Sequence, residues 1–499
     1  MPLDTQLNML ESSGLIRLAA TRPDLEYIFR HALMQDAAYQ SLPKEDRMQL
    51  HAAVGEALER LYDYEPGEAS ATLAHHFAKA AVLDKAARYL TLAGDRARAG
   101  FANREALGFY QAARGHVERL RRGDAARAEK WRQNEGILCE VEGDLLELSG
   151  RHAGARASYD RAMLSLNSDE RIGQSRLHRK MGYTWMIQRR HEKALRAYDE
   201  AEAGLGDGPA VPFAAWWQEW LEIQLDRMWL RYGRNDVAEL SQLVERARAA
   251  LEQYGTPSQR SRYFFGLVNL AYRQSCYSVT EETLANARAG FAAAQASHSI
   301  NVIADAHFVI GVCYLIHGEL QEAEAHLRDG LNLSERTGSV VIQARNLTYL
   351  VVTLRRLGRV TEVRARVAEA MSVVAAGQMW EYLATTQANM AWVAYREGDL
   401  AGAREQSQAA LQIWRELPLV YPFKWTALWP LLGVAIAEGR LADAVEHARA
   451  LLAPGQQRLP ERVALTLEAV VLADTKSQPE KVHSLLDQAV SQARVEGYL

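Results

Sequence analysis

The stretch GDLLELSGRHAGARASYDRA, residues 143–162, decides how this chain folds. Its small and bulky residues recur at steps of 3, 4, 5, 4 and 3. Steps of three and four place residues on one face of a helix, and the glycine before the longest step favours a turn. The stretch therefore predicts a helix, a tight turn and a second helix. These positions are Gly143, Leu146, Gly150, Ala155, Tyr159 and Ala162.

The same offsets return further along the chain. The small residues let paired helices approach closely, and a large residue fills the gap between them. Weaker copies occupy residues 73–97 and 101–113, and the pattern predicts about ten helix pairs in all. The clearest copies are Gly182, Trp185, Arg189, Ala194, Tyr198 and Ala201; Gly311, Tyr314, Gly318, Ala323, Leu327 and Gly330; and Ala391, Ala394, Gly398, Ala403, Ser407 and Ala410.

The spacing of the turn positions gives the length of each repeat. The later turns are 40, 40 and 41 residues apart, and the earlier ones are 39 and 44 apart. Short helix-pair repeats typically span about 34 residues. Longer helices would explain the difference, and so would turn-rich loops between repeats. The later turn positions are Gly318, Gly358, Gly398 and Gly439, and the earlier ones are Gly150, Arg189 and Gly233.

Composition narrows the class of protein. Lys and Arg minus Asp and Glu give 58 − 62 = −4 over 499 residues, so the overall charge does not indicate nucleic acid or an anionic membrane as a partner. Cys139, Cys276 and Cys313 are far apart and are expected to be reduced packing residues. The sequence has no long uncharged apolar run and no signal-peptide pattern at its start. We therefore expect a cytoplasmic protein.

The first 65 residues have a different pattern. Residues 7–18 predict a helix, a glycine stop and a strand, residues 21–24 a turn, and residues 25–29 a second strand. A helix follows from His31, and Pro43 suits the start of the next one. Helix, two-stranded wing and helix are typical of the end of a winged-helix domain.

Two resemblances follow from these patterns. The repeats resemble tetratricopeptide repeats, in the expanded form found in the sensor arms of large bacterial regulators. The segment FRHALMQDAAYQSL, residues 29–42, is similar to the winged-helix end of STAND-type signalling ATPases, where it precedes a helical arm. The resemblance implies an all-α fold: a right-handed tetratricopeptide-type α-solenoid with a small winged-helix-like segment. The expected segments are 1–65, the winged-helix remnant and connecting helix; 66–120, degenerate repeats; and 131–499, expanded repeats.

The STAND resemblance gives His31 a possible role. In that family a histidine near this helix start reaches the phosphates of bound ADP, so His31 would sense the nucleotide state if an ATPase domain is present upstream or in trans. The alternative is that His31 only caps or packs the helix start. No GxxxxGK[ST] loop occurs in the chain, so we expect no cofactor and no catalysis here. We also expect no metal site, because the adjacent His75 and His76 diverge on a helix.

The inner surface of the solenoid is the candidate binding site. Residues 13, 10, 6 and 3 positions before each turn should face the groove, and they include Glu140, Asp144 and Glu147 before Gly150. Arginines beside aromatic residues favour an anionic or planar ligand, or an acidic peptide. Packing between helices remains the alternative for each tryptophan. The predicted groove residues are Arg176, Arg179, Tyr183, Trp220, Arg227, Arg345, Arg355, Trp392, Tyr395 and Trp429.

The sequence therefore predicts a non-catalytic sensing and protein-interaction arm of a STAND-like signalling regulator, which binds an effector or partner in its groove. The alternative is a free-standing tetratricopeptide adapter that binds partner peptides. A hidden enzyme and a DNA-binding winged helix are much weaker hypotheses, because no catalytic spacing and no basic recognition helix are present.

Overall fold

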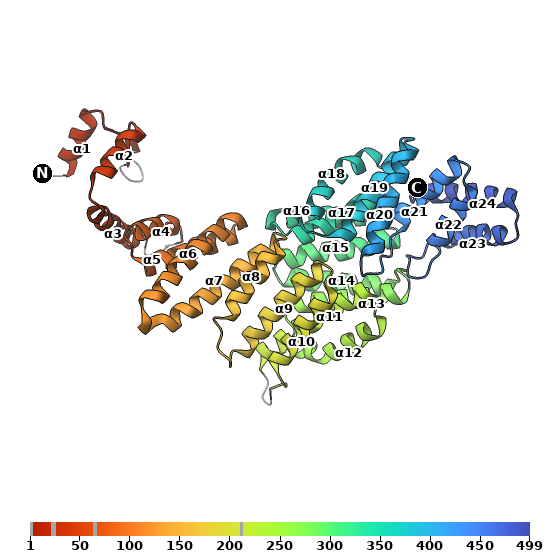
Figure 1. Ribbon diagram of the computed structural model, residues 1–499, viewed down its shortest axis with the longest axis horizontal. Helices are drawn as coiled ribbons and strands as arrows, with labels where there is room; N and C mark the ends of the chain where they lie inside the picture. Colours follow the sequence, from red (N-terminus) through yellow and green to blue (C-terminus); the bar gives the residue numbers. More distant parts are fainter. Residues whose placement is uncertain (1–2, 21–25, 63–66, 210–212) are drawn as a thin grey trace. The chain divides into compact units, whose positions relative to one another are not determined.

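The computed structural model describes residues 3–20, 26–62, 67–209 and 213–499 (Figure 1). Within these ranges the chain forms 24 α-helices, one short 3₁₀ helix and one two-stranded sheet, so the predicted all-α fold is confirmed. The chain divides into two compact units, an N-terminal unit, Met1–Leu138, and a C-terminal unit, Cys139–Leu499. The boundary falls within α7 (Ala128–Leu148). The three segments expected from the sequence, 1–65, 66–120 and 131–499, remain predictions.

The N-terminal unit begins with the helix, hairpin and helix that the sequence predicts. The two strands pair antiparallel, with Ile16 opposite Phe29, and the predicted turn at residues 21–24 lies outside the described residues. The core of this unit lies between α4 and α5, around Phe77 and Tyr89, whereas α1 and α2 bury no side chain. The elements are α1 (Leu3–Ser12), β1 (Ile16–Ala20), β2 (Glu26–Phe29), α2 (Ala32–Ser41), α3 (Lys44–Leu61), α4 (Ser70–Lys79), α5 (Leu83–Ala99), α6 (Asn103–Gly123) and the 3₁₀ helix Ala125–Arg127.

The C-terminal unit is a stack of helix pairs, as predicted. The odd-numbered member of each pair is its first helix, and each helix packs mainly on its sequence neighbours, as in an α-solenoid. The helices after α7 are α8 (His152–Met163), α9 (Arg171–Ile187), α10 (His191–Leu205), α11 (Ala214–Arg234), α12 (Val237–Tyr254), α13 (Pro257–Gln274), α14 (Glu281–Ala296), α15 (Ile300–His317), α16 (Leu320–Thr337), α17 (Val340–Arg356), α18 (Val360–Ala376), α19 (Trp380–Arg396), α20 (Leu400–Glu416), α21 (Trp425–Ala437), α22 (Leu441–Leu451), α23 (Glu461–Thr475) and α24 (Pro479–Val495).

The turns within pairs confirm the repeat register except at one place. Six of the seven predicted turn positions have a positive φ, which glycine adopts at little cost. The exception is Gly233, which lies inside the last turn of α11, while Asn235 takes the left-handed conformation at φ +60°. The predicted turn is therefore wrong by two residues in this pair. The six confirmed positions are Gly150, Arg189, Gly318, Gly358, Gly398 and Gly439.

The small and large residues of the repeat meet as expected. A methyl group added at Gly143 would lie 2.3 Å from the Tyr159 ring, and one added at Gly182 would lie 2.6 Å from the Tyr198 ring. Each tyrosine therefore lies flat against a glycine of the partner helix. Helices α15 to α20 each contain 17 or 18 residues, so longer helices explain the 40-residue repeat in this part of the chain.

The first pairs of the C-terminal unit also contact much later ones. Gln188, at the end of α9, donates a 2.6 Å hydrogen bond to Gln378, before α19. The next residue, Arg189, forms an ion pair with Glu381 in the first turn of α19. The stack therefore closes on itself at these turns.

One described helix, α15, is long and apolar enough to cross a membrane by length and composition. Half of that segment is buried inside the structure, and the helix packs against α14, α16 and α17. Burial inside the stack accounts for its apolar sequence.

Candidate functional site

The first helices of successive pairs surround a cavity of about 400 Å³ in the C-terminal unit, here called the inner cavity. The lining side chains come from α7, α9, α11, α13, α15 and α17, with Tyr159 added from α8. They combine aromatic rings with charged groups of both signs. The residues used below are Asp144, Glu147, Arg179, Lys180, Tyr183, Asp226, Trp229, Arg262, Phe265, Asn269, Asp305, Phe308, Val309 and Arg345.

Two arginines of the wall share one carboxylate. The Arg179 Nε donates a 2.7 Å hydrogen bond to Glu219, and its Nη1 lies 3.4 Å from Asp226. Arg262 donates a 2.5 Å hydrogen bond to the other oxygen of Asp226 and also pairs with Glu222. Asp226 is 2% exposed, so its charge needs both cations. These pairs link α9, α11 and α13.

Lys180 holds two acids of α7. Its Nζ lies 2.8 Å from Glu140 and 2.7 Å from Asp144. Glu140 also accepts two hydrogen bonds from Arg176, at 2.7 and 3.0 Å. Burial alone would raise the pKa of Glu140, but the bonds from Arg176 and Lys180 lower it to about 2.

Arg345 is the cation farthest along the wall. Its Nη1 donates a 3.0 Å hydrogen bond to Asp305, and its guanidinium lies over the rings of Trp229 at 4.7 Å and Phe308 at 5.9 Å. Burial would lower the pKa of Arg345, but Asp305 and neighbouring groups raise it above its ordinary value. Arg345 is therefore held as a cation, with its charge already matched.

These pairs correct the sequence-based expectation of an anionic ligand. That expectation needs arginines free to bind an anion, but all four cations of the cavity wall have carboxylate partners on adjacent helices. Each of the four cations has one carboxylate partner that is 40 residues away: Arg179–Glu219, Lys180–Glu140, Arg262–Glu222 and Arg345–Asp305.

Glu147 is the exception among the charged lining residues. Within the described part of the chain, its carboxylate has no hydrogen-bond or ion-pair partner, although it lines the cavity. Burial and the neighbouring Asp144 raise the pKa of Glu147 to about 7. Over the same residues, the Tyr183 hydroxyl and the Asn269 amide also have no hydrogen-bond partner.

Three of the predicted groove residues line the inner cavity: Arg179, Tyr183 and Arg345. Arg176 lies beside them through Glu140, although it does not line the cavity. Trp220 and Arg227 do not face it, and their placement is wrong because the turn lies at Asn235 rather than Gly233.

Trp220 and Arg227 contact α10 instead. The Trp220 indole N–H donates a 3.2 Å hydrogen bond to Glu202, and Arg227 pairs with Glu202 and Asp199. Counting back from Asn235 gives Glu222, Leu225, Trp229 and Tyr232. Of these, Leu225 and Trp229 line the inner cavity.

The last four predicted groove residues, Arg355, Trp392, Tyr395 and Trp429, pack between helices. Arg355, Trp392 and Trp429 are 0% exposed, so their assignment to an open groove is wrong. Arg355 donates 2.7 Å hydrogen bonds to the carbonyl oxygens of Thr426 and Tyr498. Tyr395 lies in the seam between α19 and α21, beside Gly433. Helix packing, the alternative considered for the tryptophans, describes these positions better.

The histidines of the N-terminal unit are placed as follows. His31 is the exposed N-cap residue of α2, and its side chain makes no capping hydrogen bond. His76 lies against His51 of α3, with the two Nδ1 atoms 3.0 Å apart. Over the described ranges, no group of three or more potential metal ligands is arranged to hold an ion.

No known family model matches the sequence, and no curated protein matches it. Solved structures share its helical architecture at low identity. A Rap protein complexed with competence and sporulation factor is 14% identical and covers 79% of this chain and 99% of its own, with a TM-score of 0.47. A Pyrococcus horikoshii STAND protein with a tetratricopeptide-repeat sensor is 13% identical and covers 84% of this chain and 64% of its own, with a TM-score of 0.41.

A chain of the APC/C hetero-tetramer Cut9–Hcn1 gives a similar result. The match is 12% identical and covers 94% of this chain and 98% of that chain, with a TM-score of 0.40. All three scores are below 0.5, so the description of the fold rests on the helix pairs of this chain.

Proposed function

We propose that this chain is a non-catalytic sensing arm of a STAND-like signalling regulator, whose repeats bind an effector in the inner cavity. The observation that carries the proposal is the cavity itself. It is bounded by first helices from six successive pairs, and its charged groups link neighbouring helices. A ligand placed there would contact several repeats at once and would bias how they stack.

The closed arrangement favours a small effector over a long peptide. An adapter that binds an extended peptide needs a groove open along its length. Here the turns at Gln188 and Gln378 meet, and Arg189 and Glu381 pair beside them. The free-standing peptide adapter is therefore the second candidate, and it would require this closure to open.

The N-terminal unit supports the proposal that this chain is attached to, or binds, a nucleotide-binding domain of a signalling regulator. Large apolar side chains are exposed along helices α1 to α3, including Leu33 at 83% and Leu61 at 67%. Exposed apolar surface of this kind often marks an interface. A nucleotide-binding domain, as the STAND resemblance implies, would cover these side chains and bring phosphates to His31.

The experiment is a thermal-shift screen of the purified chain against small-molecule classes: sugars, amino acids, amines, carboxylates and nucleotides. Val309 lines the cavity, so Val309→Phe should fill part of it and remove the response to a true effector. Val495→Phe, at a position 83% exposed on α24, is the matched control and should leave the response intact.

Circular dichroism must show that both variants keep their helical content. A ligand that stabilises the wild type and Val309→Phe equally would contradict binding in the cavity. ATP hydrolysis by the chain alone would contradict the non-catalytic role.

A further inference from the structure

One charged group on the wall of the inner cavity has no ion-pair partner among the described residues. Four cations and four carboxylates line the cavity, but seven of these eight groups are already in ion pairs. The remaining group is the carboxylate of Glu147. Within the described ranges it accepts no hydrogen bond, so a ligand that enters the cavity meets one unmatched negative charge.

Several aromatic and apolar side chains also line the cavity. Phe265 and Phe308 are 6% and 7% exposed, and both line the cavity with Trp229. Aromatic faces attract cations, and Arg345 already uses Trp229 in this way. An anion would instead meet Glu147 while finding every lining cation occupied.

Building on the proposed function, we propose that the inner cavity binds a small organic cation, an ammonium or amidinium group on an apolar body, with Glu147 as its counter-ion. The apolar body contacts the aromatic wall. The Tyr183 hydroxyl and the Asn269 amide supply further hydrogen-bonding groups, because neither has a partner within the described residues. The 400 Å³ cavity suits a small molecule.

Binding of a cation should depend on pH. Glu147 must be ionised to pair with the ligand, and its pKa is raised to about 7. With that pKa, the ionised fraction falls about tenfold between pH 8 and pH 6, and the affinity should fall by the same factor. The charged and titratable groups that act on Glu147 are Asp144, Lys180, Asp226, Arg345, Tyr159 and Tyr183.

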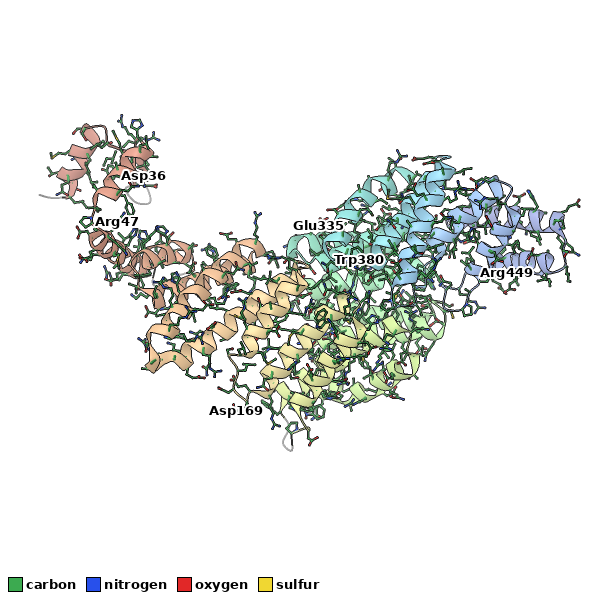
Figure 2. All side chains as sticks on the ribbon, viewed as in Figure 1. Asp36, Arg47, Asp169, Glu335, Trp380 and Arg449 are labelled. Atoms are coloured by element: carbon green, nitrogen blue, oxygen red, sulfur yellow. The ribbon has the colours of Figure 1, made fainter. Side chains whose placement is uncertain are left out.

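The test uses two probes with the same phenyl group and opposite charges, phenethylammonium and 3-phenylpropionate. Calorimetry on the whole chain should give a Kd on the order of 1 mM for the cation and binding at least tenfold weaker for the anion. Glu147→Gln should remove this preference. Glu335→Gln is the matched control, since Glu335 lies exposed on α16 (Figure 2), and it should change nothing.

Each other outcome overturns the cation assignment. If phenylpropionate binds as tightly as phenethylammonium, or if Glu147→Gln keeps the preference, Glu147 is not the counter-ion. If neither probe binds at about 10 mM, the cavity does not take this class of ligand. If phenylpropionate binds as tightly as phenethylammonium, its binding should also be measured in Val309→Phe. Loss of binding in that variant would show that the cavity is still the effector site. The proposed function would then stand, and only the cation inference would fail.

Discussion

Arg189 and Glu381 form a buried ion pair between residues 192 positions apart in the chain. The Arg189 side chain is 11% exposed and that of Glu381 is 3% exposed. Arg189 lies in the turn between α9 and α10, and Glu381 lies in the first turn of α19. The pair therefore joins two repeats that the solenoid would otherwise keep apart.

Breaking this pair from one side should be costly. Glu381→Leu leaves the Arg189 guanidinium buried without its carboxylate, and we expect the free energy of unfolding to fall by about 3 kcal/mol. The double variant Arg189→Met with Glu381→Leu should lose much less, because no charge remains unpaired. Urea unfolding followed by circular dichroism measures both.

An exposed pair provides the control for that prediction. Arg248 and Glu245 lie 2.7 Å apart with side chains 54% and 65% exposed. Glu245→Gln should change the unfolding free energy by less than about 0.5 kcal/mol. Equal losses in the single and double variants at Arg189 and Glu381 would show that packing, rather than charge, holds this contact.

The repeats could be predicted from the sequence because their signal is local. The turn residues and the glycine beneath each tyrosine recur at fixed short offsets, so six turn positions were predicted correctly. In the pair α11–α12 the offsets place the turn at Gly233, two residues before its observed position at Asn235. Asn235 adopts the left-handed conformation there, as asparagine does more readily than most residues.

The charge network of the cavity was predictable in principle but was missed. Each of its four cations pairs with a carboxylate 40 residues away, close to the spacing of the later turns. Opposite charges at one repeat spacing on successive first helices are the signal that would have identified them. The closing contact between Arg189 and Glu381 has no such signal, because it depends on the summed rotation of several helix pairs.

The glycine beneath Tyr198 should not tolerate a side chain. In Gly182→Ala the new methyl group would lie 2.6 Å from the ring, and we expect a loss of roughly 1–3 kcal/mol from overpacking between α9 and α10. Gly204, in α10, has nothing within 4 Å of the same methyl position. Gly204→Ala should therefore be neutral or stabilising by up to about 1 kcal/mol. Thermal melting compares the two variants, and equal effects would contradict the close approach.

Arg355 should be structural rather than ligand-binding. Its guanidinium bridges the carbonyl oxygens of Thr426 and Tyr498, and burial lowers its pKa. The Arg355→Lys variant lacks the planar guanidinium group that donates to both carbonyl oxygens. We therefore expect its free energy of unfolding to fall by about 2 kcal/mol or more. Any ligand found by the screen should bind the folded variant with unchanged affinity. A specific loss of binding without a loss of stability would return Arg355 to the site.

The last prediction concerns the cost of keeping Glu147 in the cavity. Its folded-state pKa of about 7 is above the ordinary value of 4.5, so the native state binds its proton more tightly than the unfolded state does. The contribution of Glu147 to the free energy of unfolding is therefore fully present below about pH 4.5 and is lost as the pH rises through 7. Glu147→Gln cannot ionise and avoids this loss.

Glu147→Gln should accordingly unfold like the wild type at pH 4 and be more stable by about 1–3 kcal/mol at pH 8. Glu335→Gln, on exposed α16, should match the wild type at both pH values. A carboxylate that lowers stability at neutral pH is expected at a functional site, where binding of a cation recovers the lost free energy. If Glu147→Gln is destabilising at pH 8, the carboxylate has a structural partner and the cavity has no free counter-ion.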